Sequence, residues 1–316
     1  MFNEWKLARD GYGEGMIELG KEDPRVVVLG ADLSDSTRAL WFREQFPDRF
    51  FSFGIAEQNM LGAAAGLALA GKIPFVCTYS VFLSGRAWDQ IRTTICYSNL
   101  NVKMGGAHGG ISVGPDGATH QALEDCALTR VLPGMTLVVP CDYYETKKAT
   151  IALGKIYGPA YIRFGREKTP VITTPETPFE LGKAAVFREG SDISLIANGY
   201  MVSQCLLAAE ELAKEGIAAR VINLHTLKPL DRETIAKAAR ETGAIVTAEE
   251  HQLVGGLGSA VAEVVATEYP VPLAMIGIND TFGESGSPEE LLAFHGLTAD
   301  NVVRVARSLL ARKKGR

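Results

Sequence analysis

The chain has 316 residues, of which 47% are hydrophobic and 22% are charged; this composition is typical of a folded globular protein with enough length for two domains. Its formal net charge of -5 argues against a general nucleic-acid binder, because no basic excess is present to release phosphate counterions. The sequence has no apolar signal core at its start and no run of about 18 apolar residues, so we expect no membrane association.

In the first half of the chain, short β-branched runs alternate with helical patterns. This alternation predicts mainly parallel sheets with helices on both faces. We expect strands at residues 25–30, 74–78, 101–105, 135–139 and 160–164. Helices are expected at residues 3–19, 37–45, 57–70, 85–98, 121–129 and 144–153. Residues 169–180 are rich in Pro and Thr, which end helices and favour an extended linker.

A second alternating unit follows the linker. Its expected strands are residues 193–197, 219–223, 244–248 and 273–278. Its expected helices are residues 203–215, 232–241, 257–267, 288–293 and 299–311. The sequence thus predicts an α/β protein with two three-layer αβα domains, at residues 1–168 and 189–316, joined by a linker at residues 169–188.

The five cysteines provide the evidence on redox state. An odd number without a CxxC pair favours reduced thiols, and hence a cytoplasmic protein.

A carboxylate stands at the start of the helix expected at residues 57–70. The segment GIAEQNM, residues 54–60, places Glu57 in the first helical turn, after a tight turn that Gly54 permits. A lone glutamate at this position can be explained by the helix dipole alone. Two downstream segments favour a chemical role instead: YSVF at residues 79–82 and GGISVGPDGATHQ at residues 109–121.

Taken in this order, the three segments resemble the pyrimidine-binding domain of transketolase, and the resemblance extends over essentially the whole chain. It implies a thiamine diphosphate pyrimidine-binding domain followed by a transketolase C-terminal domain. In that family, the glutamate at the Glu57 position hydrogen-bonds a ring nitrogen of the cofactor's aminopyrimidine. A buried carboxyl group can share a proton with that nitrogen and so control its tautomer, while the cofactor carries the carbanion chemistry.

The resemblance also implies the walls of the cofactor pocket. Tyr79 and Phe82 would stack on the aminopyrimidine, and ordinary core packing is the alternative for both. Asp32 and Leu33, in the turn after the first strand, are expected beside the cofactor. Many transketolases have a third aromatic residue where this chain has Gly85, so this part of the pocket departs from the family.

Substrate contacts can be transferred to matching positions. Ser36 and Arg9 match phosphate contacts, although a lone helical arginine is often only solvated. His108 matches a further phosphate-side contact. Arg163, at a strand end where a parallel sheet presents its ligand crevice, would bind phosphate through two hydrogen bonds. Arg166 is the local competitor for that role.

The two substrate-side residues of the 109–121 segment come next. His120 matches a contact to the hydroxyl and carbonyl oxygens of the donor, where an imidazole can stabilise a developing alkoxide. Asp116 matches the partner of the adjacent hydroxyl. A metal site at His108 and His120 is disfavoured, because their spacing matches no helical i, i+4 pair and no cysteine lies nearby.

The sequence contains no Gly-Asp-Gly followed by a spaced Asn, the motif with which thiamine diphosphate enzymes hold the diphosphate and its Mg²⁺ or Ca²⁺. We therefore expect an N-terminal transketolase subunit to carry that site, and an α2β2 heterotetramer to form the complete enzyme. The leading hypothesis is the C-terminal subunit of a split transketolase of the pentose phosphate pathway, acting on sugar phosphates. The alternatives are the beta subunit of a 2-oxo acid dehydrogenase, half of a deoxyxylulose-phosphate-synthase-like enzyme, a nicotinamide dehydrogenase and a non-catalytic binding subunit.

Overall fold

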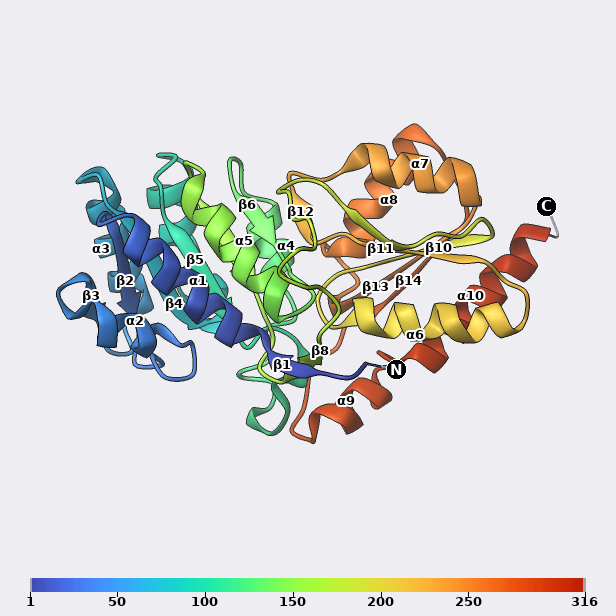
Figure 1. Cartoon of the computed structure of the whole chain (residues 1–316), viewed down its shortest axis with the longest axis horizontal. Helices are drawn as coiled ribbons and strands as arrows, with labels where there is room; N and C mark the ends of the chain where they lie inside the picture. The colour runs from blue at the N-terminus through green and yellow to red at the C-terminus, as the bar shows by residue number, and fades with distance from the viewer. Residues whose placement is uncertain (1, 315–316) are drawn as a thin grey trace.

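The structure is a computed structural model that describes residues 2–314. These residues form two α/β units that lie side by side, each with a mainly parallel sheet between helices (Figure 1). The first unit runs from blue to green in Figure 1, and the second from yellow to red. This is the α/β architecture that the sequence predicts.

The first unit is built on a seven-stranded sheet with the order β12-β6-β7-β5-β4-β2-β3. Its strands are β2 (Val26–Gly30), β3 (Phe50–Ser52), β4 (Ile73–Tyr79), β5 (Lys103–Ala107), β6 (Thr136–Val138), β7 (Ala160–Arg163) and β12 (Thr226–Lys228). All neighbours are parallel except β12, which pairs antiparallel with β6. The helices are α1 (Ala8–Glu22), α2 (Ala39–Gln45), α3 (Glu57–Leu69), α4 (Asp125–Arg130) and α5 (Tyr143–Lys155).

Strand β2 explains why the sheet is covered on both faces. Val26 and Val28 belong to the core cluster beneath α1 and α5, whereas Val27 and Leu29 belong to the cluster beneath α3. Because side chains alternate along a strand, an unbroken apolar run buries both faces.

The second unit has a five-stranded sheet with the order β14-β13-β10-β11-β9. Its strands are β9 (Ala185–Arg188), β10 (Ile193–Ala197), β11 (Ala219–Asn223), β13 (Ile245–Gln252) and β14 (Leu273–Ile278). Only β9 runs antiparallel to its neighbour. The helices are α6 (Met201–Lys214), α7 (Arg232–Thr242), α8 (Leu257–Glu268), α9 (Pro288–Phe294) and α10 (Ala299–Lys314).

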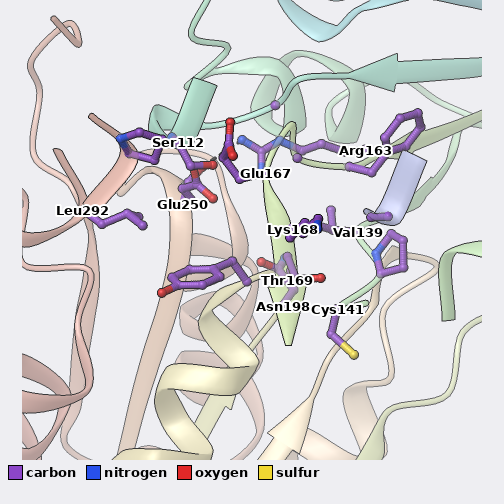
Figure 2. Close-up of a pocket in the computed structure, with 18 of the residues that line it drawn as sticks. Ser112, Val139, Cys141, Arg163, Glu167, Lys168, Thr169, Asn198, Glu250 and Leu292 are labelled. Atoms are coloured by element: carbon purple, nitrogen blue, oxygen red, sulfur yellow. Dashed lines mark hydrogen bonds between the residues drawn. The ribbon is translucent and has the colours of Figure 1, made fainter. Parts of the chain in front are cut away.

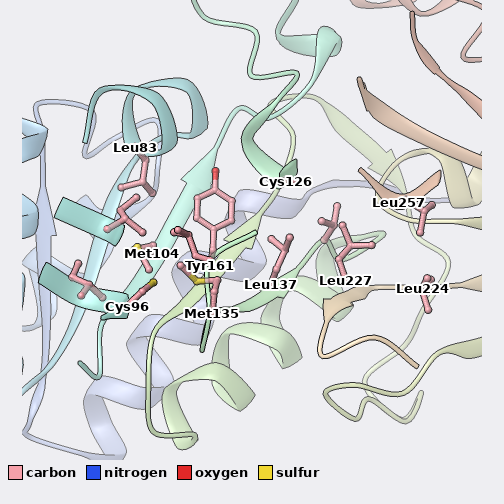
Figure 3. Close-up of a cluster of buried hydrophobic side chains, with 14 of the residues drawn as sticks. Leu83, Cys96, Met104, Cys126, Met135, Leu137, Tyr161, Leu224, Leu227 and Leu257 are labelled. Carbon is pink, nitrogen blue, oxygen red and sulfur yellow. The ribbon is translucent and has the colours of Figure 1, made fainter. Parts of the chain in front are cut away.

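The two units share one apolar core. Leu137 and Tyr161 of the first sheet belong to the same buried cluster as Leu224 and Leu257 of the second unit, together with Leu227 of β12 (Figure 3). Burial of this surface stabilises the arrangement by the hydrophobic effect. The first sheet therefore depends on the second unit for part of its cover.

The structure corrects several predicted elements. The helix expected from residue 3 begins at Ala8, because β1 (Trp5–Leu7) pairs with β8 (Lys168–Pro170). The expected helix at residues 85–98 is replaced by two π-helical stretches, Phe82–Arg86 and Gln90–Cys96. The helix expected at 121–129 begins at Asp125, and the strand expected at 101–105 is β5, two residues further on. Strand β9 and all but the first residue of β8 lie inside the stretch predicted as a linker.

Within residues 2–314, none of the helices combines the length and the apolar character that a bilayer span requires.

Candidate active site

Glu57 is the first residue of α3 and is 1% exposed. The turn before it is made by Gly54, whose φ of 64° is in the left-handed region that glycine adopts readily. The Oε2 of Glu57 accepts a hydrogen bond from Arg86 Nη1 at 2.8 Å, whereas its Oε1 is buried and has no partner. Because buried polar atoms are normally hydrogen-bonded, the orphaned Oε1 marks a place where a ligand can donate.

A pocket of about 310 Å³ opens beside this carboxylate. It lies beyond the carboxyl ends of β2 and β4, where parallel sheets commonly bind ligands. Its walls come from the turn after β2, the start of α3, the π-helical stretch after β4 and the 109–121 loop. They consist of Ala31, Asp32, Leu33, Ile55, Glu57, Phe82, Arg86 and His120. Of the predicted cofactor contacts, Glu57, Phe82, Asp32 and Leu33 thus meet in one pocket.

Tyr79 lies next to this pocket in a cluster of aromatic and imidazole rings. Its ring stacks on that of His108 with centroids 4.0 Å apart, and it lies 6.0 Å from Phe82 at an interplanar angle of 16°. The His120 ring meets Phe82 edge-on at 5.2 Å. The structure therefore brings these four residues together from three segments of the chain.

Arg86 is the site residue that sequence reasoning missed. Its guanidinium lies 4.5 Å from the centre of the Phe82 ring and pairs with Glu57. The π-helical stretch that carries Arg86 and Phe82 is of a kind often found at functional sites. Phe82 and Arg86 are four residues apart, a spacing that places side chains on one helix face, so the sequence did hold a signal for this pair.

A cationic group lies around His108. Arg9 Nη1 donates to the Ser36 carbonyl at 3.3 Å, and Arg9 Nε is buried without a partner. Burial, reinforced by Arg9, Arg166 and Arg38, lowers the pKa of His108 to about 3. Burial and the neighbouring Arg38 also lower the pKa of Arg9. Unpaired donors and mutually repelling cations are the features of a site that an anion would stabilise.

Arg163 has other partners, and the structure speaks against its predicted phosphate contact. Its Nε donates to both carboxylate oxygens of Asp125 at 3.0 and 3.1 Å, and its Nη2 donates to the carbonyls of Ala122 and Glu250 at 3.1 and 2.8 Å. Its 5% exposure fits an internal ion pair. Figure 2 shows it at the wall of a separate cavity of about 140 Å³ between the two units. Arg166, the competitor, is the arginine that joins the cationic group.

Asp116 and His120 lie on the 109–121 loop. Asp116 is exposed, and its carboxylate lies 3.2 Å from Arg166 Nη1. The Nδ1 of His120 is 2.9 Å from the Thr119 hydroxyl, which leaves Nε2 without a hydrogen-bond partner among the described residues. The loop thus places the His120 imidazole in the wall of the pocket, whereas the Asp116 carboxylate lies beside Arg166.

A buried group of potential metal ligands lies elsewhere. Ligand atoms of Asp125, Cys126 and His251 are within 4.8 Å of one another. The Asp125 carboxylate is already bound by Arg163 and by the Tyr161 hydroxyl, and both His251 ring nitrogens have backbone partners. A metal here would break these contacts, so we assign the group to packing.

Comparisons with known proteins place this geometry in a family. Residues 7–171 match the model for the transketolase pyrimidine binding domain, and residues 182–302 match that for the transketolase C-terminal domain. The 6-deoxy-6-sulfo-D-fructose transketolase subunit of Clostridium sp. is 44% identical over 98% of this chain and 96% of its own. One subunit of the apulose-4-phosphate transketolase of Phocaeicola vulgatus is 38% identical over 97% and 98%. A solved structure described as a split gene transketolase, inactive beta4 tetramer, superposes with a TM-score of 0.91 at 50% identity, over 97% of this chain and 99% of that one.

Proposed function

Because the chain belongs to the transketolase family, and its relatives include a putative transketolase C-terminal section and a split gene transketolase, we propose that it is the C-terminal subunit of a thiamine diphosphate-dependent split transketolase. Its reaction would transfer a two-carbon ketol unit from a ketose phosphate to an aldose. The observation that carries this proposal is the buried, unpartnered Oε1 of Glu57 in a pocket that Phe82 and His120 also line.

The pocket fits the aminopyrimidine end of thiamine diphosphate. Glu57 Oε1 would accept from a ring nitrogen and hold a proton there, while Arg86 keeps the other carboxylate oxygen. Tyr79 and Phe82 would flank the ring, and Asp32 and Leu33 would close the pocket. When bound, the cofactor supplies the carbanion chemistry of ketol transfer. The Mg²⁺ or Ca²⁺ ion and the diphosphate would be held by the partner subunit.

The cationic group would hold the phosphate of the sugar. Arg9 offers an unpartnered Nε, Ser36 lies beside it, and the neutral His108 offers a ring nitrogen without a partner. Arg166 replaces Arg163 as the second guanidinium of this proposal because the Arg163 guanidinium is buried against Asp125, whereas Arg166 is partly exposed. The charge of Arg166 also contributes to lowering the pKa of Arg9 and of His108.

The substrate's reacting end would meet the 109–121 loop. His120 would donate to the oxygen on which negative charge develops, and this stabilises the charge most where water is excluded. Asp116 would accept from the adjacent hydroxyl. The relatives are named for a sulfosugar and for apulose phosphate, so we propose an anionic ketose as the donor class; a place in the pentose phosphate pathway stays a prediction.

The partner proposal rests on the missing diphosphate motif. A relative described as an inactive beta4 tetramer, together with relatives named as subunits, supports activity only with an N-terminal subunit. Paired sites built from two chains imply two-fold symmetry, so we propose an α2β2 heterotetramer.

The test compares Glu57→Gln with wild type in the complex reconstituted with the N-terminal subunit. Glutamine keeps the size but cannot exchange a proton, so we expect kcat to fall at least about a hundred-fold, the scale of a lost positioned acid or base. Exchange of the proton at the cofactor's thiazolium carbon, followed by NMR, should slow as well. Glu44→Gln, at an exposed residue of α2, is the control. Full activity of Glu57→Gln, or ketol transfer by the purified chain alone, would refute the proposal.

A further inference from the structure

The second unit touches the first where the proposed substrate contacts stand, on the loop of residues 109–121 that carries Asp116 and His120. We call this the substrate loop. Two segments of the second unit reach it: residues 281–287, which precede α9, and the end of β13 at Glu250.

Gln121, next to His120, forms the first anchor. Its Nε2 donates to the carbonyls of Ile111 and Gly114 inside the loop, at 3.3 and 3.2 Å. The same amide donates across the interface to the Glu284 carbonyl at 2.9 Å. Gln121 is 3% exposed, so one buried amide joins the two ends of the loop and ties them to the second unit. Such a bond matters because carbonyls left without a donor after burial are costly.

The residues at this anchor are closely packed. A Cβ built on Gly283 would lie 1.8 Å from Gln121 Oε1, and one built on Gly117 would lie 2.7 Å from the Ser285 hydroxyl oxygen. Each contact is shorter than real Cβ atoms tolerate, so the Gln121 and Ser285 side chains occupy space that only a glycine leaves open. The position of segment 281–287 therefore fixes the position of the substrate loop.

Glu250 forms the second anchor, at the other end of the loop. Its Oε1 accepts from the Ser112 backbone N–H at 2.6 Å, and Figure 2 shows the two residues side by side at the cavity between the units. Gly110, with φ of 98°, lets the carboxylate approach, since a Cβ there would lie 2.2 Å from Oε1. A charge-assisted bond to a backbone N–H is stronger than a neutral one.

We infer that the second unit positions the substrate loop, with Gln121 and Glu250 as positioning residues for Asp116 and His120. We call these two anchors, Gln121 and Glu250, the clamp. The clamp follows from contacts alone, and its effect on catalysis rests on the proposed function. Because neither Gln121 nor Glu250 lines the pocket beside Glu57, loosening them lowers kcat/KM for the donor and leaves cofactor binding unchanged.

The test uses Gln121→Glu, which keeps the shape but places a carboxylate oxygen against three carbonyls in place of the donor. Amide hydrogen exchange at residues 110–120 should speed up about ten-fold or more in the isolated chain, because local opening becomes easier. In the reconstituted complex kcat/KM for the donor should fall about ten-fold, with the thiamine diphosphate KM within about three-fold of wild type. Gly283→Ala should give the same pattern by pushing on the loop from the second unit.

Gln204→Glu is the matched control, since Gln204 makes its bonds to Ala299 and Tyr200 inside the second unit; it should change neither quantity. If amide exchange at residues 110–120 is unchanged in both Gln121→Glu and Gly283→Ala, the clamp is refuted. Two variants are used so that the result does not depend on the folding of one of them. Faster exchange with an unchanged kcat/KM for the donor would refute the positioning role. If the wild-type complex shows no ketol transfer, the proposed function fails, while the exchange measurement still decides on the clamp.

Discussion

Replacing Arg163 with Ala should destabilise the chain rather than weaken phosphate binding selectively. Arg163 and Asp125 are 5% and 0% exposed, and two of the guanidinium's nitrogens reach the Asp125 carboxylate and two carbonyls. Removing it leaves a buried carboxylate whose remaining side-chain donor is the Tyr161 hydroxyl at 3.0 Å. One of the lost bonds, to the Glu250 carbonyl, also joins the two units.

Breaking a buried pair by removing one partner costs about 3–5 kcal/mol, because an uncompensated charge stays buried. A loss of 1 kcal/mol lowers Tm by about 2–4 °C in domains of roughly 150–250 residues. We therefore expect Arg163→Ala to lower Tm by about 6–20 °C in a thermal melt of the purified chain.

Arg166→Ala is the control. Its side chain is 31% exposed and pairs with Asp116 and Glu167, and exposed pairs contribute only about 0–1 kcal/mol. It should melt near wild type but raise the KM for phosphorylated donors about ten- to hundred-fold, from the loss of a charge-assisted contact worth about 1.5–3 kcal/mol. A normal Tm for Arg163→Ala together with a selective rise in that KM would overturn the reassignment.

Three further outcomes are expected. Burial lowers the pKa of Lys103 to about 7, so from pH 7 to about 10.4 the unfolded chain holds a proton that the folded chain has released. The free energy of unfolding should rise with pH across this window in wild type, and denaturation curves of Lys103→Met should lack that rise. His108, with a pKa near 3, should show no NMR titration between about pH 5 and 8; a midpoint near 6.5 would contradict its burial. In a double-mutant cycle of Arg86→Met and Glu57→Gln, the free energy of unfolding should show a coupling of about 0.5–3 kcal/mol. A coupling of zero would show that the ion pair does not contribute to stability.

The sequence predicted most of the fold because its signals are local. Strands β2 and β4 are buried at every residue, and their sequences VVVLG and IPFVCTY are accordingly mostly apolar and contain several β-branched residues. Strands that pair at an edge left weaker signals. β1, β8 and β12 have three residues each, and a three-residue segment is too short to show a period.

Part of the candidate site could also be predicted from local sequence motifs. Glu57, Phe82 and His120 were predicted from the motifs that carry them, and they line one pocket. The roles of Arg163 and Arg166 could not be predicted from the sequence, because two arginines three residues apart offer the same side-chain chemistry. Arg163 ends β7 and is buried against Asp125, whereas Arg166 lies beyond Gly165 on the side of Arg9 and His108.

The sequence by itself thus determined the α/β class, the order of the main elements and the carboxylate at the start of α3. Only the tertiary structure decided which arginine is internal, that Arg86 pairs with Glu57, and that Gln121 ties the substrate loop to Glu284 in the second unit. The hydrophobic period of a segment reflects which of its side chains are buried, and this pattern is set by the helix or strand that the segment forms. The partner of a buried charge or amide comes from another part of the chain, here 29, 38 and 163 residues away, and packing alone brings the two together.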